Sequence, residues 1–361
     1  MRLLLLLLRS SGVLALAAVG YLALFPTGRY VTRAAWEEAH ILARRQSIPA
    51  LIADPATSPH VRAKLQLVLD ARAYAQDSLH LRAGRSFTTY STLTHDTLVL
   101  VLSGAYRDRL EPVTWWFPVV GRVPYKGFFD FAAARAAEHQ LQADSLDAYL
   151  RPSPAFSTLG FFNDPLLSTS IADDSAELAN TVIHELTHNT FYASGQAVFN
   201  ESFANFAGSR GAAQFFRSRG DTALAGTVDN RWHDEVVMAR FWERTYRALD
   251  SAYRAHPEGK AARIAAHDTV YERARDDLIR TVGPQLLTVV VRYLARARLD
   301  NAELLARRIY LTDLDLFDAV FAREGHDARR AIAQVIALAR TRPDDPYGAV
   351  RDWLSGSGGA P

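Results

Sequence analysis

The residues best suited to chemistry gather in one stretch, HELTHNTFYASGQAVFNES, which runs from residue 184 to residue 202. His184 and His188 are four residues apart, so on a helix both imidazoles lie on one face, about 6 Å apart, where they can bind one cation. Glu185 lies about 100° round that helix and borders the cation, where a general base for a metal-bound water belongs. This spacing predicts a catalytic metal site, for which zinc is the natural ion.

Glu201 is the predicted third ligand, because a glycine lies close to the midpoint between it and His188. Gly195 can adopt the positive φ angle that ends a helix. A turn there places His188 and Glu201 each about 9–10 Å of helix rise from the turn, hence level on two antiparallel helices. The hairpin therefore delivers a carboxylate to the two imidazoles.

Three other interpretations of these residues compete with a His-His-Glu site. A metzincin needs glycine and histidine where this chain has Phe191 and Ser194, so that class is rejected. A polar helix pair with ordinary salt bridges would use the same side chains without a metal. A di-iron bundle is suggested by the E-x-x-H spacing of Glu37 and His40, but the strands expected between them and the hairpin argue against it.

Several polar residues are candidates for supporting roles around the metal. Asn200 and Asn205 flank Glu201 on the same helix, and either amide oxygen could orient a metal-bound histidine. Tyr125, His233 and Tyr310 are candidates to stabilise the oxyanion of the reaction.

The segment before the metal helix could contribute to substrate binding. Residues 159–167 are expected to be extended and could pair with the backbone of a peptide substrate. Asn163 and Asp164 in this segment are then candidates to meet a substrate amine.

Composition limits what kind of protein this is. The 361 residues include 41 basic and 39 acidic side chains, for a net charge of +2, so nothing marks a nucleic-acid-binding protein. The chain contains no cysteine, which excludes disulfides and thiolate ligands. A metal must therefore be held by His, Asp or Glu.

The N-terminus reads MRLLLLLLRSSGVLALAAVGYLALF and predicts an uncleaved signal anchor or transmembrane helix. A cleaved signal peptide is the rival, with the small-residue spacing of Ala15 and Ala17, but cleavage there would leave a hydrophobic end. Arg29 and Arg33 follow the segment. They weaken any assignment of its orientation in the membrane from the rule that positive charges stay on the cytoplasmic side.

The remaining pattern predicts an α+β fold, with helices and a small sheet followed by a mostly helical C-terminal half. Strands are expected between Phe87 and Phe129, and extended chain over residues 153–171. The expected helices cover residues 30–46, 58–79, 131–143, 174–192, 197–217, 228–255, 260–281, 284–298, 301–309, 314–323 and 326–340. The last fifteen residues are expected to fray.

These elements suggest four regions along the chain. They are an anchor (1–28), an α+β core that carries the metal helix (29–220), a helical C-terminal region (221–342) and a tail (343–361).

The motifs NDPLLST, HELTH and FNES together resemble the bacterial putative aminopeptidase family, a group of predicted zinc-dependent, gluzincin-like proteins. The segments IPALIADPATSPHVRAKLQLVLDARAYA, WFPVVGRVPYKGFF and AFSTLGFFNDPLLSTS agree with that resemblance, which covers roughly residues 30 to 340. It implies a zincin-like core and Zn²⁺ held by His184, His188 and Glu201, with Glu185 as base.

Two features of the family pattern are missing here. Family members often begin as lipoproteins with a modified cysteine, which this chain lacks, so a membrane anchor would replace the lipid and keep the enzyme on the periplasmic side of the cell membrane. The Gly-x-Met-Glu-Asn motif of well-known gluzincin aminopeptidases is also absent, which leaves open how a free amino terminus would be held.

The predicted function is a zinc-dependent metallopeptidase of the aminopeptidase kind, acting on peptide substrates. The alternative is a non-catalytic domain of the cell envelope, anchored in the membrane, that binds zinc structurally or serves as a scaffold. A structural site needs a fourth protein ligand, which the hairpin sequence does not offer. The sequence does not reveal side-chain specificity or oligomeric state, and the predicted ligands do not exclude cobalt or manganese.

Overall fold

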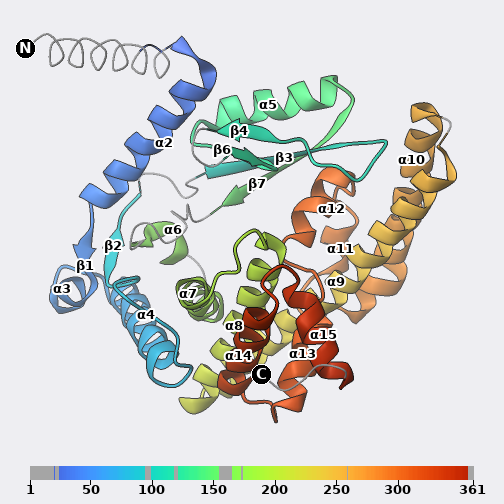
Figure 1. Ribbon diagram of the computed structural model, residues 1–361. Helices are drawn as coiled ribbons and strands as arrows, with labels where there is room; N and C mark the ends of the chain where they lie inside the picture. Colours follow the sequence, from blue (N-terminus) through green and yellow to red (C-terminus); the bar gives the residue numbers. More distant parts are fainter. Residues whose placement is uncertain are drawn as a thin grey trace, which may run out of the picture.

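The structure of the protein is a computed structural model that describes residues 20, 24–93, 99–117, 121–153, 165–171, 174–257 and 259–356. Figure 1 shows two helices, α7 (Ser175–Thr190) and α8 (Ala197–Ser218), side by side in the middle of the molecule. The N-terminal helices lie on one side of this pair and the C-terminal helices on the other, and a small sheet lies above it. The chain is mostly helical with small sheets.

The N-terminal part packs on α7 through helix α4 (Pro59–Asp77). This helix begins where the sequence predicts it, with Ser58 accepting a hydrogen bond from the Val61 amide at 3.3 Å and proline at the first helical position. It follows α2 (Pro26–Ala43) and α3 (Ile48–Ala53). The predicted helix over residues 30–46 ends early, because Gln46–Ser47 form strand β1.

A short sheet ties this part to the segment before the metal helix. Strand β1 pairs antiparallel with β2 (Thr89–Ser91), and β2 pairs parallel with β8 (Leu166–Leu167). Helix α6 (Ser168–Ile171) follows β8 directly and leads toward α7. Of the extended chain predicted over residues 153–171, residues 154–164 lie outside the described residues, and residues 168–171 form helix α6 instead, so that part of the prediction is wrong.

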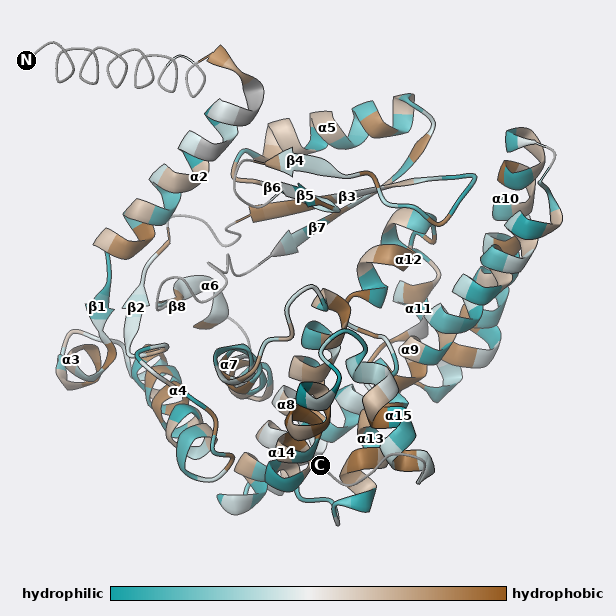
Figure 2. Ribbon diagram, viewed as in Figure 1, coloured by the Kyte–Doolittle hydropathy of each residue, from teal (hydrophilic) through white to brown (hydrophobic). Residues whose placement is uncertain are grey.

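The larger sheet lies above α7 and α8 and is covered by α5 (Phe131–Ala143) (Figure 1). Its central strand, β3 (Val99–Tyr106), pairs antiparallel with β6 (Tyr125–Phe128) and β7 (Leu146–Ser153). Figure 2 shows the hydrophobic residues that run along β3. Strands β4 (Trp115–Phe117) and β5 (Gly121–Val123) form a separate pair. The predicted strand region is confirmed, whereas β7 was not predicted.

The main core surrounds α8. Phenylalanines 199, 203 and 206 on this helix are almost fully buried and pack around Phe317, with ring centres 5.6–5.9 Å apart. Helices α7 and α8 approach closely at Gly208, where a Cβ atom would lie only 2.5 Å from Asn180 Oδ1. A larger residue there would push the two helices that carry the predicted metal ligands apart.

The C-terminal half wraps helices around this core. They are α9 (Thr222–Ala255), α10 (Lys260–Asp277), α11 (Val291–Leu294), α12 (Asn301–Arg308), α13 (Leu314–Arg323), α14 (Ala328–Thr341) and α15 (Pro346–Ser355). Between α10 and α11 the chain forms a π-helical turn (Leu278–Val282) and a 3₁₀ turn (Gly283–Gln285).

Two predictions in this half are wrong. The helix expected over residues 284–298 is reduced to the four residues of α11. Gly283–Gln285 form the 3₁₀ turn, and the β-branched residues 288–290 just before α11 have low helix propensity. The tail expected to fray instead forms α15, which begins at the Asp345 cap and buries Ala349 and Val350 in the core.

The predicted anchor, residues 1–28, lies mostly outside the described residues. Within the described part of the chain, no helix combines the length and the apolar character needed to cross a bilayer.

Candidate metal centre

The hairpin of α7 and α8 is fixed at its turn and at its start. Gly195 has the positive φ angle of 77° that the sequence predicts, and α8 begins two residues later. Asn200 clamps the turn, because its side-chain amide accepts from the Ala193 amide and donates to the Ala193 carbonyl, both at 2.8 Å. At the other end of α7, Asp174 accepts from the Glu177 amide at 2.9 Å and pairs with Arg231.

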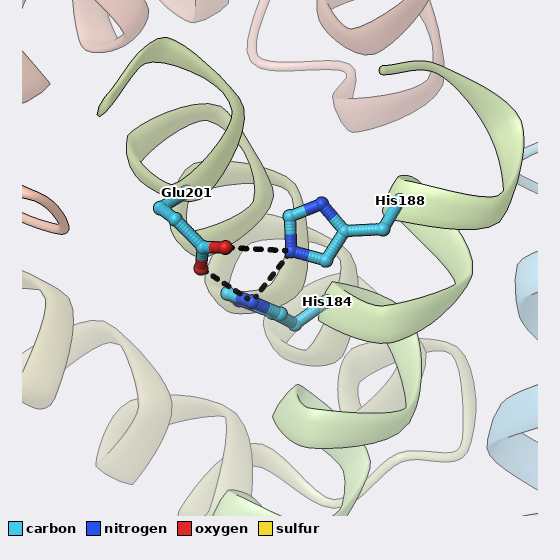
Figure 3. Close-up of side chains that lie close together, drawn as sticks. All are labelled: His184, His188 and Glu201. Carbon is cyan, nitrogen blue, oxygen red and sulfur yellow. Dashed lines mark hydrogen bonds and ion pairs between the residues drawn. The ribbon is translucent and has the colours of Figure 1, made fainter. Parts of the chain in front are cut away.

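Three side chains of the hairpin converge on one point (Figure 3). The Nε2 atoms of His184 and His188 are 3.1 Å apart, and they lie 3.5 and 3.6 Å from the two carboxylate oxygens of Glu201. One ligand atom from each residue lies within 4.8 Å of the others. Two imidazoles and one carboxylate in this arrangement form a set of donors that can hold a divalent cation with a coordination position left open.

The charges of these groups suit a cation as well. Burial raises the pKa of Glu201, but the hydrogen bonds to His184 and His188 have the larger, opposite effect. The pKa of Glu201 is lowered to about 2 as a result. Glu201 is therefore ionised at neutral pH. Burial lowers the pKa of His184, and the hydrogen bond to Glu201 with the nearby charge of Glu185 raises it to a greater extent. The nearby carboxylates favour a positive charge at His184. A bound cation would supply that charge in place of a proton.

Glu185 lies beside these ligands with its carboxylate unengaged. It follows His184 on α7, is half-buried, and contributes to the negative potential at that imidazole. In the described ranges, none of the hydrogen bonds or ion pairs uses its side chain. The carboxylate is therefore free to accept a proton.

Two of the three oxyanion candidates lie close enough to the centre to be affected by its charge. The negative charge of Glu201 acts on both Tyr125 and Tyr310. Burial first, and then Glu201, raise the pKa of Tyr310 to about 12, so its hydroxyl is protonated and can donate a hydrogen bond. Both tyrosines are therefore within electrostatic range of Glu201.

Comparison with known protein families assigns the chain to a family. The family model described as "Putative aminopeptidase" matches residues 29–346, which include the hairpin and most of the chain. The chain belongs to the putative aminopeptidase family. No curated protein and no solved structure matches it.

Some residues predicted to take part in the site have other partners in the structure. Asn200 holds the hairpin turn, and Asn205 donates to the Tyr310 carbonyl at 3.1 Å. Neither amide bonds to His184 or His188 in the described structure. This corrects the prediction that one of these asparagines orients a histidine. His233 is exposed, with its Nε2 atom 3.1 Å from the Gln285 carbonyl. Asn163 and Asp164 lie outside the described residues.

Two residues near the candidate metal centre were not predicted from the sequence. Glu235 on α9 has a fully enclosed Oε2 atom without a hydrogen-bond partner in the described structure, and its pKa is raised to about 7 by burial and by the charge of Glu177. It acts electrostatically on His184. Its position gave a signal, because it belongs to an apolar stripe with Trp232 and Ala239. The second is Arg151 on β7, which lies against Tyr310.

Proposed function

We propose that this protein is a zinc-dependent peptidase of the aminopeptidase family, with zinc held by His184, His188 and Glu201. Membership of the family supports a peptidase. The observation that carries the zinc proposal is the convergence of two imidazole Nε2 atoms and one ionised carboxylate, from the two arms of a hairpin, within 4.8 Å. This donor set matches the coordination that catalytic zinc prefers.

The donor set favours a catalytic site over a structural one. A structural zinc site is closed by four protein ligands, whereas a catalytic one keeps a position for water. Among the described residues the cluster holds three candidate ligands and no fourth. Glu185 borders this open position with its carboxylate free.

In the proposed reaction each residue has a distinct task. Zinc, when bound, polarises the peptide carbonyl and makes water acidic enough to lose a proton near neutral pH. Glu185 accepts that proton and passes it to the amine that leaves. Tyr310 donates a hydrogen bond to the oxyanion of the tetrahedral intermediate. Asn200 keeps Glu201 in place through the turn.

The test compares wild-type protein with Glu185→Gln, using release of amino acids from a panel of short peptides and elemental analysis of bound metal. Wild-type protein should hydrolyse at least one peptide and lose this activity with a chelator. Glu185→Gln should keep its zinc and lose about 10²–10⁴-fold in kcat, the usual share of a general base. A zinc-loaded wild type without activity on any peptide would favour the structural alternative, and unchanged activity in Glu185→Gln would refute the mechanism.

A further inference from the structure

Arg151 lies on an edge strand of the sheet above the metal centre. Among the strands that the structure describes, β7 pairs with β3 alone, and Arg151 lies opposite Val101. Because side chains alternate along a strand, Arg151 shares a face with Tyr149 and Asp147. That face packs toward α12, since the guanidinium of Arg307 lies 5.6 Å from the Tyr149 ring and Asp147 accepts from the Asn301 amide.

Tyr310 connects Arg151 to the metal centre. The guanidinium carbon of Arg151 lies 5.7 Å from the centre of the Tyr310 ring. The carbonyl of Tyr310 accepts a hydrogen bond from Asn205, one turn of α8 beyond Glu201. The charges of Glu201 and Arg151 both act on Tyr310, so the two residues lie near the same tyrosine. An extended peptide covers about 3.3–3.6 Å per residue, so a few residues are enough to reach from one side of this tyrosine to the other.

The positive charge of Arg151 has no carboxylate partner in the part of the chain that the structure describes. Two other arginines near this face of β7 do have carboxylate partners. Arg307 pairs with Glu303 at 3.1 Å, and Arg107 pairs with Asp268 at 2.6 Å. Arg151 is also half-buried, where an unpaired charge is less well solvated than at the surface. A guanidinium in this position offers a fork of donors that matches a carboxylate.

We propose that Arg151 binds the C-terminal carboxylate of the substrate, so that the enzyme acts on short peptides with a free carboxyl end. This inference rests on the proposed function, because the peptide must lie between the metal centre and β7. It assigns to Arg151 a role in substrate selection rather than in the chemical step. Long chains and peptides with a blocked carboxyl end would lose this contact.

The experiment measures binding rather than turnover, so that it does not depend on catalysis. The probes are trialanine and trialanine amide, and their dissociation constants are measured by calorimetry on zinc-treated Glu185→Gln protein. Trialanine should bind about 10–100-fold more tightly than the amide, the range expected for hydrogen bonds to a charged group. In a Glu185→Gln protein that also carries Arg151→Gln, the ratio should fall to about one, and with Arg151→Lys it should be intermediate.

Arg307→Gln is the matched control, because it removes a nearby cation that is already paired, and it should leave the ratio unchanged. A ratio near one before Arg151 is altered, a ratio that survives Arg151→Gln, or no binding of trialanine at millimolar concentration would each overturn the proposal. Equal loss of affinity for both probes would assign Arg151 to another role. Failure of the peptidase itself is seen separately, as no hydrolysis by wild-type protein, and the affinity ratio still decides the role of Arg151.

Discussion

Asn200 and Ala193 exchange two hydrogen bonds of 2.8 Å across the turn between α7 and α8. Asn200 is 2% exposed and directly precedes Glu201. The residue next to the proposed ligand therefore fixes how the second arm of the hairpin meets the first. This link ties the stability of the turn to the geometry of the metal centre.

Removing the Asn200 clamp should weaken both folding and metal binding. Asn200→Ala deletes two buried hydrogen bonds and leaves the Ala193 groups unpaired, so the free energy of unfolding should fall by about 2–4 kcal/mol. Zinc affinity should fall with it, because Glu201 loses its fixed position. Urea unfolding and zinc titration measure the two effects. Gln196→Ala, at an exposed bond to the Asp344 carbonyl, is the control, and equal effects of both changes would contradict the clamp.

The hydroxyl of Tyr310 should be needed for the chemical step. Tyr310→Phe should lower kcat by about 10²–10³-fold with little change in KM, because a donor to the oxyanion acts in the transition state. Steady-state kinetics on any hydrolysed peptide measures this. Tyr125→Phe serves for comparison, since Tyr125 is 45% exposed and should lower kcat by less than about tenfold in the same assay. A larger loss of kcat in Tyr125→Phe than in Tyr310→Phe would assign the stabilisation of the oxyanion to Tyr125 instead.

His267 should stabilise the fold below neutral pH. It is 4% exposed and lies between Asp147 (Nε2–Oδ2, 2.9 Å) and Asp268 (Nδ1–Oδ1, 2.7 Å), joining α10 to β7. Burial lowers the pKa of His267, but the bonds and charges of the two aspartates raise it more, against the opposing charge of Arg107. A raised folded-state pKa gives a stabilisation that is complete below about pH 6.5 and is lost as the pH rises through the pKa of the folded protein.

This dependence can be measured by urea unfolding of wild type and His267→Gln at several pH values. The difference in unfolding free energy should be about 1.5–3 kcal/mol near pH 6, as expected for hydrogen bonds to charged groups, and should shrink toward pH 9. The exposed His60 gives a control, and His60→Gln should show no such trend. A difference that grows with pH would contradict the assignment.

Local signals in the sequence predicted the parts of the fold that local chemistry determines. Helices α4 and α7 begin at the predicted starts, where Ser58 and Asp174 cap them, and α5 and α13 have the predicted bounds. Gly195 marked the turn of the hairpin because few other residues adopt its φ angle. The approach of His184, His188 and Glu201 followed from helix geometry alone.

Features that depend on contacts far along the chain were not predictable in this way. Strand β7 gains its partners from β3, some forty residues earlier, and its sequence LDAYLRPS mixes charged residues with apolar ones. Helix α15 is held by burial of Ala349 and Val350 against the core rather than by its own propensity. Glu235, which acts on His184, and Arg151, which lies against Tyr310, come from elements whose placement only the tertiary structure gives.

The central claim is that the hairpin binds zinc, and elemental analysis of the full-length protein after zinc loading and desalting tests it most directly. Wild type and the control His233→Ala, whose histidine bonds to the Gln285 carbonyl, should each retain about one zinc per chain. His188→Ala and Glu201→Ala should lose most of it, because each removes one of three ligands. Absence of zinc from the wild type, or undiminished zinc in both ligand variants, would contradict the account.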